Sequence, residues 1–546
     1  MEGNRMAKMI FPQYARGREG AELEKGATVL EHIRGIGGVE IGSECGGRGI
    51  CGKDIIRIAR GMESLDKPTP AEHRFAEQGV LKANHRLACQ ARVANDTEDI
   101  TVFIPDFGSY TILTDTLETD VECDPSVSGN DGRVVYDTGE DCGRYEGNIY
   151  GLAIDVGTTT LVMQAVDLET GTNVGKPIAS KNPQIGYGND VISRIGYTRD
   201  NADGLQELQK AAADGINSTI MQLEKDLEQE PGEISSSIYD VVAVGNSTMR
   251  DILFGRSVET LGVIPFEPED HSPLLCRASE LGLAVHPEAR IYGPGLIGGH
   301  AGADCMADII AARIYEKDEV SMIIDIGTNG EIVIGNRDRL MTASCAAGGA
   351  YEGYQIRCGV GAVAGAVIQV AIRNGNPIMK TLNDAPPVGV CGSGVIDLLA
   401  ELYKNEIMTA QTRIEKDYCL TDTVCLSQDD INQLIIAKAG LRSDQDLLLK
   451  YYGAGIDDID SIYLAGAFGN YMNIENAMTI GLLPRAAPEQ FIRFGNGALA
   501  GARDMLLSRK RRRDSERLLD MVEHTKPNEI EGSEFAYIVA DNMYFT

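Results

Sequence analysis

The chain has few positive charges, no long apolar run and no dense arrangement of cysteines. Its 50 Lys and Arg residues are outnumbered by 81 Asp and Glu, and the net charge of −31 argues against nucleic-acid binding. No apolar run reaches the roughly 18 residues of a membrane span, and the mostly polar N-terminus predicts no secretory signal. Twelve cysteines without a disulfide framework indicate a reducing compartment, and we expect a cytoplasmic protein.

An apolar run that ends in an acid, followed by a turn of small and hydroxyl residues, occurs twice. The copies end at Asp155 and at Asp325. Each apolar run predicts a buried strand. The turn glycines let backbone N–H groups approach a phosphate, and the acid suits the accompanying Mg²⁺. A second apolar strand follows each turn, so the sequence predicts two related half-domains that face one nucleotide.

A further strand, residues 240–245, runs into Asn246, Ser247 and Thr248. Hydroxyl and amide side chains at this place either line the same cleft or cap the helix that follows. The sequence leaves both roles open.

Near the N-terminus, cysteines alternate with glycines. Cys45 and Cys51 flank a glycine-rich stretch, and Cys89 follows later in the chain. Such glycines permit a loop whose N–H groups turn inward onto bridging sulfides, as an iron–sulfur cluster requires. The alternative is a glycine-rich turn that carries two buried cysteines.

This loop resembles the [2Fe–2S] domain of plant-type ferredoxins, and more closely the N-terminal domain of the reductive activators of corrinoid proteins. The family pattern is Cys-x5-Cys-x2-Cys with a distant fourth Cys. Cys45, Cys51 and Cys89 match it, whereas the third position holds Asp54. The resemblance implies a [2Fe–2S] cluster, and at the position that departs from the pattern we favour Asp54 as a ligand, because a carboxylate can bind iron. The alternatives are His85 as that ligand and an absent or labile cluster.

Three segments follow from composition. Residues 1–104 are expected to form a small β-rich, ferredoxin-like domain, and residues 149–546 a large α/β domain of alternating strands and helices. The range 105–148 between them holds eleven acidic residues against two arginines. That composition predicts a flexible, self-repelling linker, which serves either as a tether for a moving domain or as a spacer.

The large domain resembles the superfamily of acetate and sugar kinases, Hsp70 and actin. Residues 155–159 and 325–330 look like its two phosphate motifs, and 464–469 look like its adenosine motif. The resemblance implies a two-lobed α/β ATPase with duplicated ribonuclease H-like lobes. It implies that Asp155 and Asp325 position Mg²⁺ and water and that Glu331 orients the attacking water. The nucleotide contacts that it implies are Gly157, Thr158, Thr159, Gly327, Thr328, Asn329, Gly330, Gly466, Phe468 and Gly469.

Over its whole length the chain is similar to the ATP-dependent reductive activators of corrinoid enzymes. The resemblance implies that a low-potential ferredoxin or flavoprotein supplies one electron, which passes through the cluster to a corrinoid protein of a methyltransferase or O-demethylase system and reduces Co(II) to Co(I). ATP with Mg²⁺ supplies the energy. Association into a homodimer is compatible with the sequence.

Three other functions use the same motifs. A small-molecule kinase shares the cleft but has no need of Cys45, Cys51 and Cys89. An activator of radical dehydratases also joins this ATPase fold to an iron–sulfur centre, but without a ferredoxin-like domain. A plain electron-transfer module has no need of the intact turns at Asp155 and Asp325.

Overall fold

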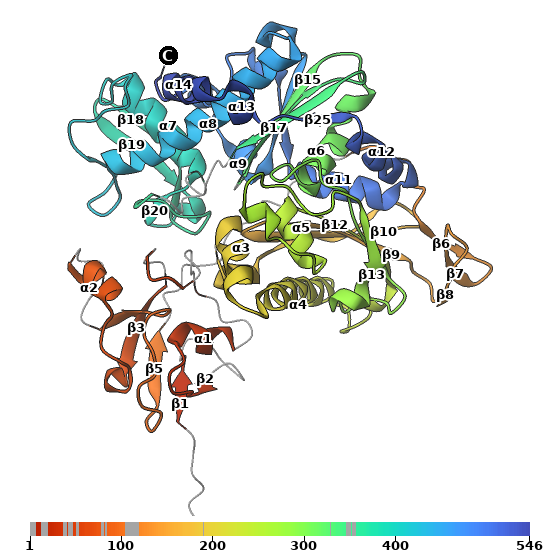
Figure 1. The fold of residues 1–546 in the computed structure, drawn as a ribbon, viewed down its shortest axis with the longest axis horizontal. Coiled ribbons are helices and arrows are strands. Elements are labelled where there is room, and N and C mark those ends of the chain that lie inside the picture. Colours follow the sequence, from red (N-terminus) through yellow and green to blue (C-terminus); the bar gives the residue numbers. More distant parts are fainter. Residues whose placement is uncertain are drawn as a thin grey trace, which may run out of the picture. The chain divides into compact units, whose positions relative to one another are not determined.

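The computed structural model describes residues 7–11, 20–35, 41, 47–50, 54–77, 81, 84–103, 119–188, 190–327, 329–345, 351 and 356–545. The chain divides into two compact units (Figure 1). The first unit comprises residues 1–107 with 182–212, and the second comprises 108–181 with 213–546.

A five-stranded sheet forms the N-terminal part of the first unit, as expected for a small β-rich domain. Its order is β2-β1-β5-β3-β4, with β1 and β5 parallel and the other pairs antiparallel. Thr28 and Glu31 cap the helix α1 reciprocally. Met9, Phe11, Ile33, Ile56 and Leu87 belong to the core beneath the sheet. The elements are β1 (Lys8–Ile10), β2 (Gly20–Glu22), α1 (Val29–Arg34), β3 (Ile55–Arg60), α2 (Pro70–Glu77), β4 (His85–Leu87) and β5 (Ile100–Phe103).

The segment 182–212 completes the first unit with η2 (Pro183–Gly186), α3 (Val191–Asp200) and the start of α4 (Gly204–Asp226). Arg34 of α1 donates a hydrogen bond to the carbonyl oxygen of Gly186, and its guanidinium lies 4.6 Å from the ring centre of Tyr187. These contacts attach the segment to the N-terminal sheet.

Two six-stranded sheets with matching topology build the second unit. The first has the order β11-β10-β9-β12-β14-β13 and the second the order β24-β23-β15-β16-β17-β25. In each, three successive antiparallel strands precede strands that add in parallel, β12 and β14 in one sheet and β23 and β24 in the other. The expected duplicated lobes are therefore confirmed. The strands of the first sheet are β9 (Tyr150–Val156), β10 (Thr160–Asp167), β11 (Asn173–Lys181), β12 (Ile238–Val244), β13 (Leu274–Arg277) and β14 (Arg290–Gly293). Those of the second are β15 (Ser321–Ile326), β16 (Gly330–Gly335), β17 (Leu340–Cys345), β23 (Ser461–Ala465), β24 (Phe491–Gly495) and β25 (Val522–His524).

Two helices of small residues, α6 (Ala303–Ala312) and α11 (Gly497–Leu507), pack together between the two sheets (Figure 1). A β-carbon on Gly501 would lie 2.0 Å from the carbonyl oxygen of Ala307, so only glycine permits this approach. One apolar core joins these helices to side chains of both sheets, such as Val242 and Ile323.

The second lobe carries an additional layer on the other face of its sheet. There α7 and α8 pack with Ile324, Ile332 and Ile334 into a large apolar core. The elements of this layer are β18 (Ala366–Arg373), β19 (Asn376–Thr381), β20 (Gly389–Val390), α7 (Gly392–Lys404), β21 (Tyr418–Cys419), β22 (Cys425–Leu426) and α8 (Gln428–Tyr452). The remaining helices of the second unit are α5 (Ser247–Leu253), α9 (Gly466–Tyr471), α10 (Ile474–Thr479), α12 (Arg509–Leu519), α13 (Pro527–Glu531) and α14 (Ser533–Asp541).

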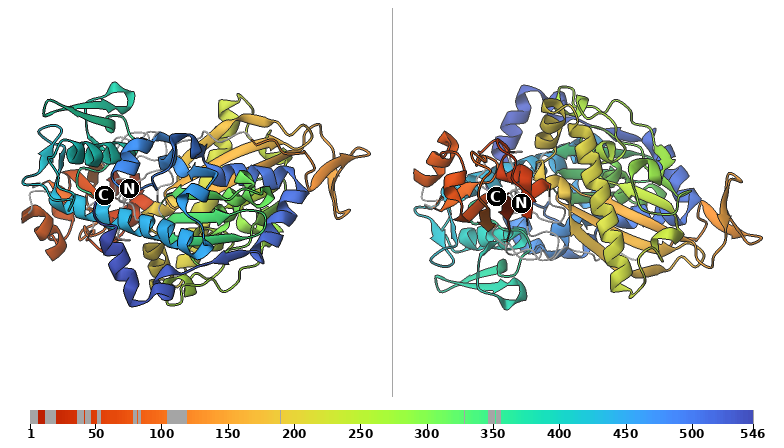
Figure 2. Two further views of the ribbon diagram at one scale, coloured as in Figure 1. Left: turned by 90° about the horizontal axis from the view of Figure 1, so that it is seen from above. Right: turned by 90° about the horizontal axis from the view of Figure 1, so that it is seen from below.

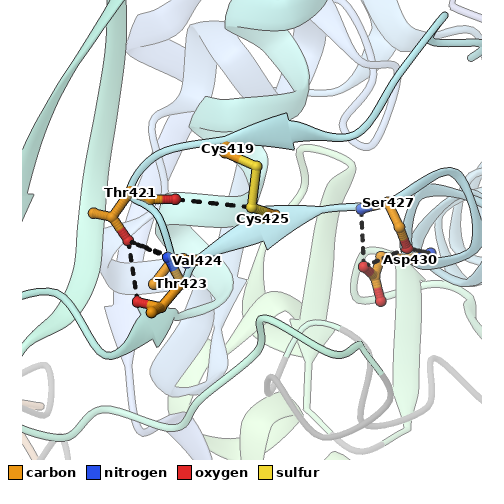
Figure 3. Close-up of a disulfide and its surroundings, with 7 residues drawn as sticks. All are labelled: Cys419, Thr421, Thr423, Val424, Cys425, Ser427 and Asp430. Carbon is orange, nitrogen blue, oxygen red and sulfur yellow. Dashed lines mark hydrogen bonds between the residues drawn. A yellow bond between two sulfur atoms is a disulfide. The ribbon is translucent and has the colours of Figure 1, made fainter. Parts of the chain in front are cut away.

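One disulfide, Cys419–Cys425, joins β21 to β22 (Figure 3). The hairpin that it closes leads directly into α8, whose first turn is capped by Ser427 and Asp430. The other cysteines in the described part of the chain are free thiols, in agreement with the absence of a dense disulfide framework.

The expectation of a flexible linker over 105–148 is wrong for its second half. Residues 127–144 form a three-stranded sheet of β6 (Val127–Asn130), β7 (Arg133–Tyr136) and β8 (Asp141–Arg144), which stands out from one end of the second unit (Figure 2). Tyr136 anchors it by donating a hydrogen bond of 2.5 Å to the carbonyl oxygen of Tyr239. The average charge of the segment concealed the two side chains, Val134 and Tyr136, that β7 buries on one face.

Among the described residues, no helix combines the length and the apolar character that crossing a membrane takes.

Candidate functional site

The first phosphate-type turn joins β9 to β10, as the sequence predicts. Asp155 lies near the end of β9, and a β-carbon on Gly157 would lie 2.8 Å from the carbonyl oxygen of Thr160, so the tight turn requires glycine. Thr158 is buried and accepts a hydrogen bond of 3.0 Å from the side-chain amide of Asn246. Asn246 also caps α5, since its oxygen accepts from the N–H of Met249. Of the two roles left open for the 246–248 turn, capping of the helix is therefore confirmed, and lining of the cleft stays a prediction.

The second turn joins β15 to β16. The N–H of Gly327 donates to the carbonyl oxygen of Asn329 at 3.0 Å, which closes the turn. Gly330 opens β16, where a β-carbon would lie 2.1 Å from Leu441 of α8. Asp325 and Glu331 are directly paired across the two strands. Thr328 lies outside the described residues.

Five carboxyl groups, of which Asp308 and Glu331 are buried and the other three half-buried, gather between the two turns. Asp155, Asp325 and Glu331 come from the strands, while Asp304 and Asp308 come from α6. Burial raises the pKa of Asp155 and of Asp325 to about 6, and burial with the charges of these two raises the pKa of Asp304 to about 7. Burial and neighbouring acids also hold the pKa values of Asp308 and Glu331 well above the ordinary range.

Glycines allow the surrounding backbone to approach these acids closely. A β-carbon on Gly466 would lie 2.4 Å from Asp325, and one on Gly497 would lie 2.2 Å from Asp308. The side-chain amide of Asn496, at the N-cap of α11, donates to Asp155 at 2.8 Å. The strand ends of both lobes and the two small-residue helices therefore meet at one acidic site.

Asp304 and Asp308 escaped the sequence-based selection of site residues. The sequence places Asp304 only at the start of a connecting helix. Their spacing of four residues puts both carboxyl groups on one face of α6, and two acids on the same face of an otherwise apolar helix are the signal that could have revealed them.

This concentration of acids fits a divalent cation. Burial raises their pKa values and repulsion from neighbouring carboxylates adds to this for most of them, and a bound cation would relieve the repulsion. Within the described ranges, no three acidic, histidine or cysteine side chains form a preformed metal cage. That arrangement agrees with Mg²⁺, which usually takes one or two carboxylates and completes its shell with water and phosphate oxygens.

The adenosine-type motif lies where β23 ends and α9 begins. Gly466 adopts a φ of +83°, in the left-handed region that glycine tolerates. Gly469 is buried against the backbone of Leu464, and Arg493 donates to the carbonyl oxygen of Met472 at 3.0 Å. The strand β23 therefore leads directly into α9 through a left-handed glycine. The placement of the Phe468 side chain lies outside what the structure describes.

In the N-terminal sheet, two of the expected cluster ligands lie side by side. Asp54 is fully buried, and its Oδ2 accepts a hydrogen bond of 2.6 Å from the backbone N–H of Cys89. The side-chain amide of Gln90 donates to the carbonyl oxygen of Gly47 at 3.1 Å, which ties the glycine loop to the same place. Cys45 and Cys51 lie outside the described residues.

The structure places Asp54 and His85 differently along the paired strands β3 and β4. Asp54 precedes β3 and also binds the chain after β4, because the N–H of Ala88 donates to its carbonyl oxygen at 2.8 Å. His85 pairs with Arg57 further along the two strands. A buried carboxylate against the Cys89 backbone is therefore part of the glycine-loop region.

Three family models match the chain in order. Residues 16–94 match the 2Fe-2S iron-sulfur cluster binding domain, residues 150–317 match the RACo middle region, and residues 319–545 match the C-terminal domain of RACo, the ASKHA domain. Together the matches extend over most of both units.

Individual relatives show the same similarity. The corrinoid activation enzyme RamQ of Eubacterium limosum is 30% identical over 391 residues, which span 66% of this chain and 65% of RamQ. The [Co(II) methylated amine-specific corrinoid protein] reductase of Methanosarcina barkeri is 25% identical over 66% of this chain and 71% of its own length. A solved structure of a reductive activator for corrinoid,iron-sulfur protein superposes with a TM-score of 0.70 and 26% identity, and covers 99% of this chain and 98% of its own.

Proposed function

This chain belongs to the RACo family, and on that premise we propose that it is an ATP-dependent reductive activator of a corrinoid protein, which it reduces from Co(II) to Co(I). One observation carries the proposal: a cluster-type domain precedes, in the same chain, a duplicated ATPase fold with buried acids between its two phosphate-type turns. Neither a kinase nor a simple ferredoxin needs both parts.

We assign a separate role to each of three segments. Residues 1–104 carry the electron, 105–148 connect, and 149–546 bind and hydrolyse ATP. A [2Fe–2S] cluster, when bound, supplies one-electron chemistry. The residues that would hold it are Cys45, Cys51, Asp54 and Cys89. Asp54 contributes a second effect, because its bond to the Cys89 N–H fixes the distance between two of these ligands.

In the ATPase domain, Asp155 and Asp325 are our candidates for Mg²⁺, and Glu331 for the attacking water. Asp304 lies close enough to Glu331 for its charge, together with burial, to raise the pKa of Glu331, and it stands at the start of α6. We therefore add Asp304 to the residues that organise this water. The phosphate contacts are Gly157, Thr158, Thr159, Gly327, Thr328, Asn329 and Gly330, and the adenosine contacts are Gly466, Phe468 and Gly469.

In this scheme, ATP binds one arrangement of the two lobes more tightly than the other. Only such a difference in affinity allows ATP to assist the reduction. In the arrangement that ATP favours, the chain binds the corrinoid protein differently. This difference changes the ligands of the cobalt, which is the substrate. Hydrolysis then restores the first arrangement.

The proposal also includes an electron donor, a partner system and a location for the protein. A low-potential ferredoxin or flavoprotein supplies the electron, and the corrinoid protein belongs to a methyltransferase or O-demethylase system. A cytoplasmic location agrees with the free thiols at most of the described cysteines. A homodimer is compatible with this scheme and is not required by it.

The deciding experiment is anaerobic. Chemically reduced chain is mixed with a Co(II) corrinoid protein from a methyltransferase system, and the Co(I) absorption band is followed with and without Mg-ATP. The expected result is Co(I) that forms faster with ATP and fails to form without the chain. ATP-dependent phosphorylation of sugars or small acids with no Co(I) would overturn the proposal in favour of a kinase.

A further inference from the structure

Four consecutive apolar residues stand exposed on the first lobe of the ATPase. Val263, Ile264, Pro265 and Phe266 lie between η4 (Thr260–Gly262) and β13, and we name them the 263–266 tip. Ile264 is 83% exposed, Val263 56% and Phe266 37%. Scattered surface apolar residues are ordinary, but a continuous exposed run is typical of a binding surface.

The tip is held in one unfavourable conformation rather than left loose. Phe266 has a φ of +60°, in the left-handed region that a bulky side chain rarely adopts. Its N–H donates back to the carbonyl oxygen of Val263 at 2.6 Å, which makes a closed turn. Backbone strain of this kind persists only where surrounding contacts enforce it, and it concentrates at functional positions.

Contacts from both lobes enforce this conformation. On the first lobe, the carbonyl oxygen of Phe266 packs so closely on Gly299 that a β-carbon there would lie 1.6 Å away. From the second lobe, Lys526 follows β25, donates to the carbonyl oxygen of Pro265 at 3.1 Å and forms an ion pair with Glu267. The position of the tip therefore depends on how the two lobes are arranged.

A short path leads from the tip to the acidic site. Gly299 belongs to the turn that precedes α6, and the N–H groups of Ala303 and Asp304 at the start of α6 donate to the carbonyl oxygen of Gly245 at 3.0 and 3.2 Å. Asn246, next in the chain, holds Thr158 of the first phosphate-type turn. These backbone contacts connect the first phosphate-type turn to Phe266.

The charged residues around the tip indicate what kind of surface it binds. Acidic residues dominate its flanks, with Glu259, Glu269 and Asp270 exposed and Glu267 half-buried. Arg256 pairs with Asp270 at 3.6 Å, and Lys526 pairs with Glu267. A second copy would bring the same acidic flanks together across a symmetric contact, which is unfavourable. The complementary surface is an apolar pocket with a basic rim.

We propose that the 263–266 tip is a docking contact for the corrinoid protein, inserted into an apolar, basic-rimmed pocket of that partner. The inference rests on the proposed function. Among the partners in that scheme, the corrinoid protein is the one whose grip must respond to ATP, and the tip is an exposed apolar element that both lobes hold. A few apolar side chains at the centre of such a contact carry most of the binding free energy.

The test compares tip variants with a matched surface variant. The double variant Val263→Ser, Ile264→Ser removes exposed apolar area and touches no core, while Leu275→Ser changes a side chain of β13 that is 57% exposed. The readouts are the KM for the corrinoid protein and kcat in ATP-dependent Co(I) formation, and the ATPase rate without partner. The expected result is a KM raised at least tenfold in the double variant, with kcat at saturating partner and partner-free ATPase unchanged, and a KM within twofold of the parent for Leu275→Ser.

Other outcomes overturn the inference separately from the function. If the double variant has the same KM for the corrinoid protein as the parent, the tip is not a docking contact for that protein, while the proposed function stands. Loss of self-association or of affinity for the electron donor, with parent-like KM for the corrinoid protein, assigns the tip to a different occupant. A parent chain that forms no Co(I) refutes the proposed function and the tip with it. The variant Glu269→Lys, which reverses one flanking charge, should raise the same KM, and an unchanged or lower value contradicts the basic rim.

Discussion

Asp54 and Cys89, 35 residues apart in the sequence, are joined by a hydrogen bond of 2.6 Å from the backbone N–H of Cys89 to the carboxylate of Asp54. Asp54 occupies the position where the family pattern has cysteine, and its carboxylate is fully buried. A buried carboxylate requires a hydrogen-bond donor or a cation to offset its desolvation. This single contact satisfies part of that requirement and leaves the side chain beside a proposed cluster ligand.

Replacing Asp54 tests its role at the cluster. We expect Asp54→Ala to lower the iron and sulfide content of the purified protein and to change its visible and EPR spectra. Asp54→Cys should restore the cluster with a spectrum closer to that of all-thiolate ferredoxins. His85→Ala is the control and should keep the parent spectrum. An Asp54→Ala protein with the parent's content and spectra would remove Asp54 from the ligands.

The acidic site should control ATP hydrolysis. Asp325→Asn removes a proposed Mg²⁺ contact, and we expect kcat for ATP to fall about 100-fold, the usual effect of losing one electrostatic group at a phosphate site. Asp338→Asn, at an exposed acid in the turn between β16 and β17, should leave kcat unchanged. Steady-state phosphate release measures both. Equal rates in Asp325→Asn and the parent would place the catalytic site elsewhere.

The same acids predict a pH dependence of stability. Burial raises the folded-state pKa of Asp304 to about 7, above that of the unfolded chain. The folded protein therefore holds its proton more tightly, so stability from this group is present below about pH 4 and is lost as pH rises through 7. We expect Asp304→Asn, which mimics the neutral acid, to exceed the parent in melting temperature by a larger margin at pH 8 without Mg²⁺ than at pH 5, because the parent loses this contribution progressively between the two pH values.

Differential scanning calorimetry at both pH values checks this expectation. Mg²⁺ with ATP should remove the advantage of the variant at pH 8, because the cation relieves the repulsion that the substitution relieves. An advantage that is equal at pH 5 and pH 8 would show that ionisation of Asp304 plays no part.

The crossing of α6 and α11 should tolerate no added atom. Gly501→Ala forces a methyl group against the backbone of Ala307, and we expect the free energy of unfolding to fall by about 1–3 kcal/mol. Gly196→Ala is the matched control: it lies inside the helix α3 with no atom within 4 Å of the new methyl group, and it should raise stability by about 0.5–1 kcal/mol. Urea titration measures both. A neutral Gly501→Ala would mean that the helices can separate freely.

The disulfide between β21 and β22 should stabilise the hairpin that leads into the N-terminal end of α8. It closes a loop with a sequence separation of 6, for which the chain-entropy model gives about 2 kcal/mol. We expect the double variant Cys419→Ser, Cys425→Ser to unfold at lower urea and to lose its sensitivity to dithiothreitol, while Cys276→Ser keeps the parent response. A parent protein that dithiothreitol does not destabilise contradicts this role.

Sequence patterns anticipated the parts of the site that depend on neighbours along the chain. The turns after Asp155 and Asp325 follow from apolar strands that end in small residues. These features are local, so strand periodicity and glycine spacing suffice to predict them.

The remaining features depend on contacts between distant residues. The spacing of Asp304 and Asp308 indicates two acids on one face of α6, but which part of the fold that face meets depends on how α6 lies between the sheets. The contact between Asp54 and Cys89 depends on the pairing of β3 with β4. The small sheet of β6–β8 was missed because a count of charges over forty residues averages out the alternation of side chains that buries Tyr136.

The contact of Gly501 with Ala307 also has a mechanical consequence. Two backbones already in van der Waals contact cannot be compressed, since protein interiors are as densely packed as crystals. Any rearrangement of the lobes must then turn about this crossing instead of shortening it. Displacement grows with distance from a pivot, so a small rotation there moves the outer parts of each lobe, the 263–266 tip among them, farther than it moves the acids beside the pivot.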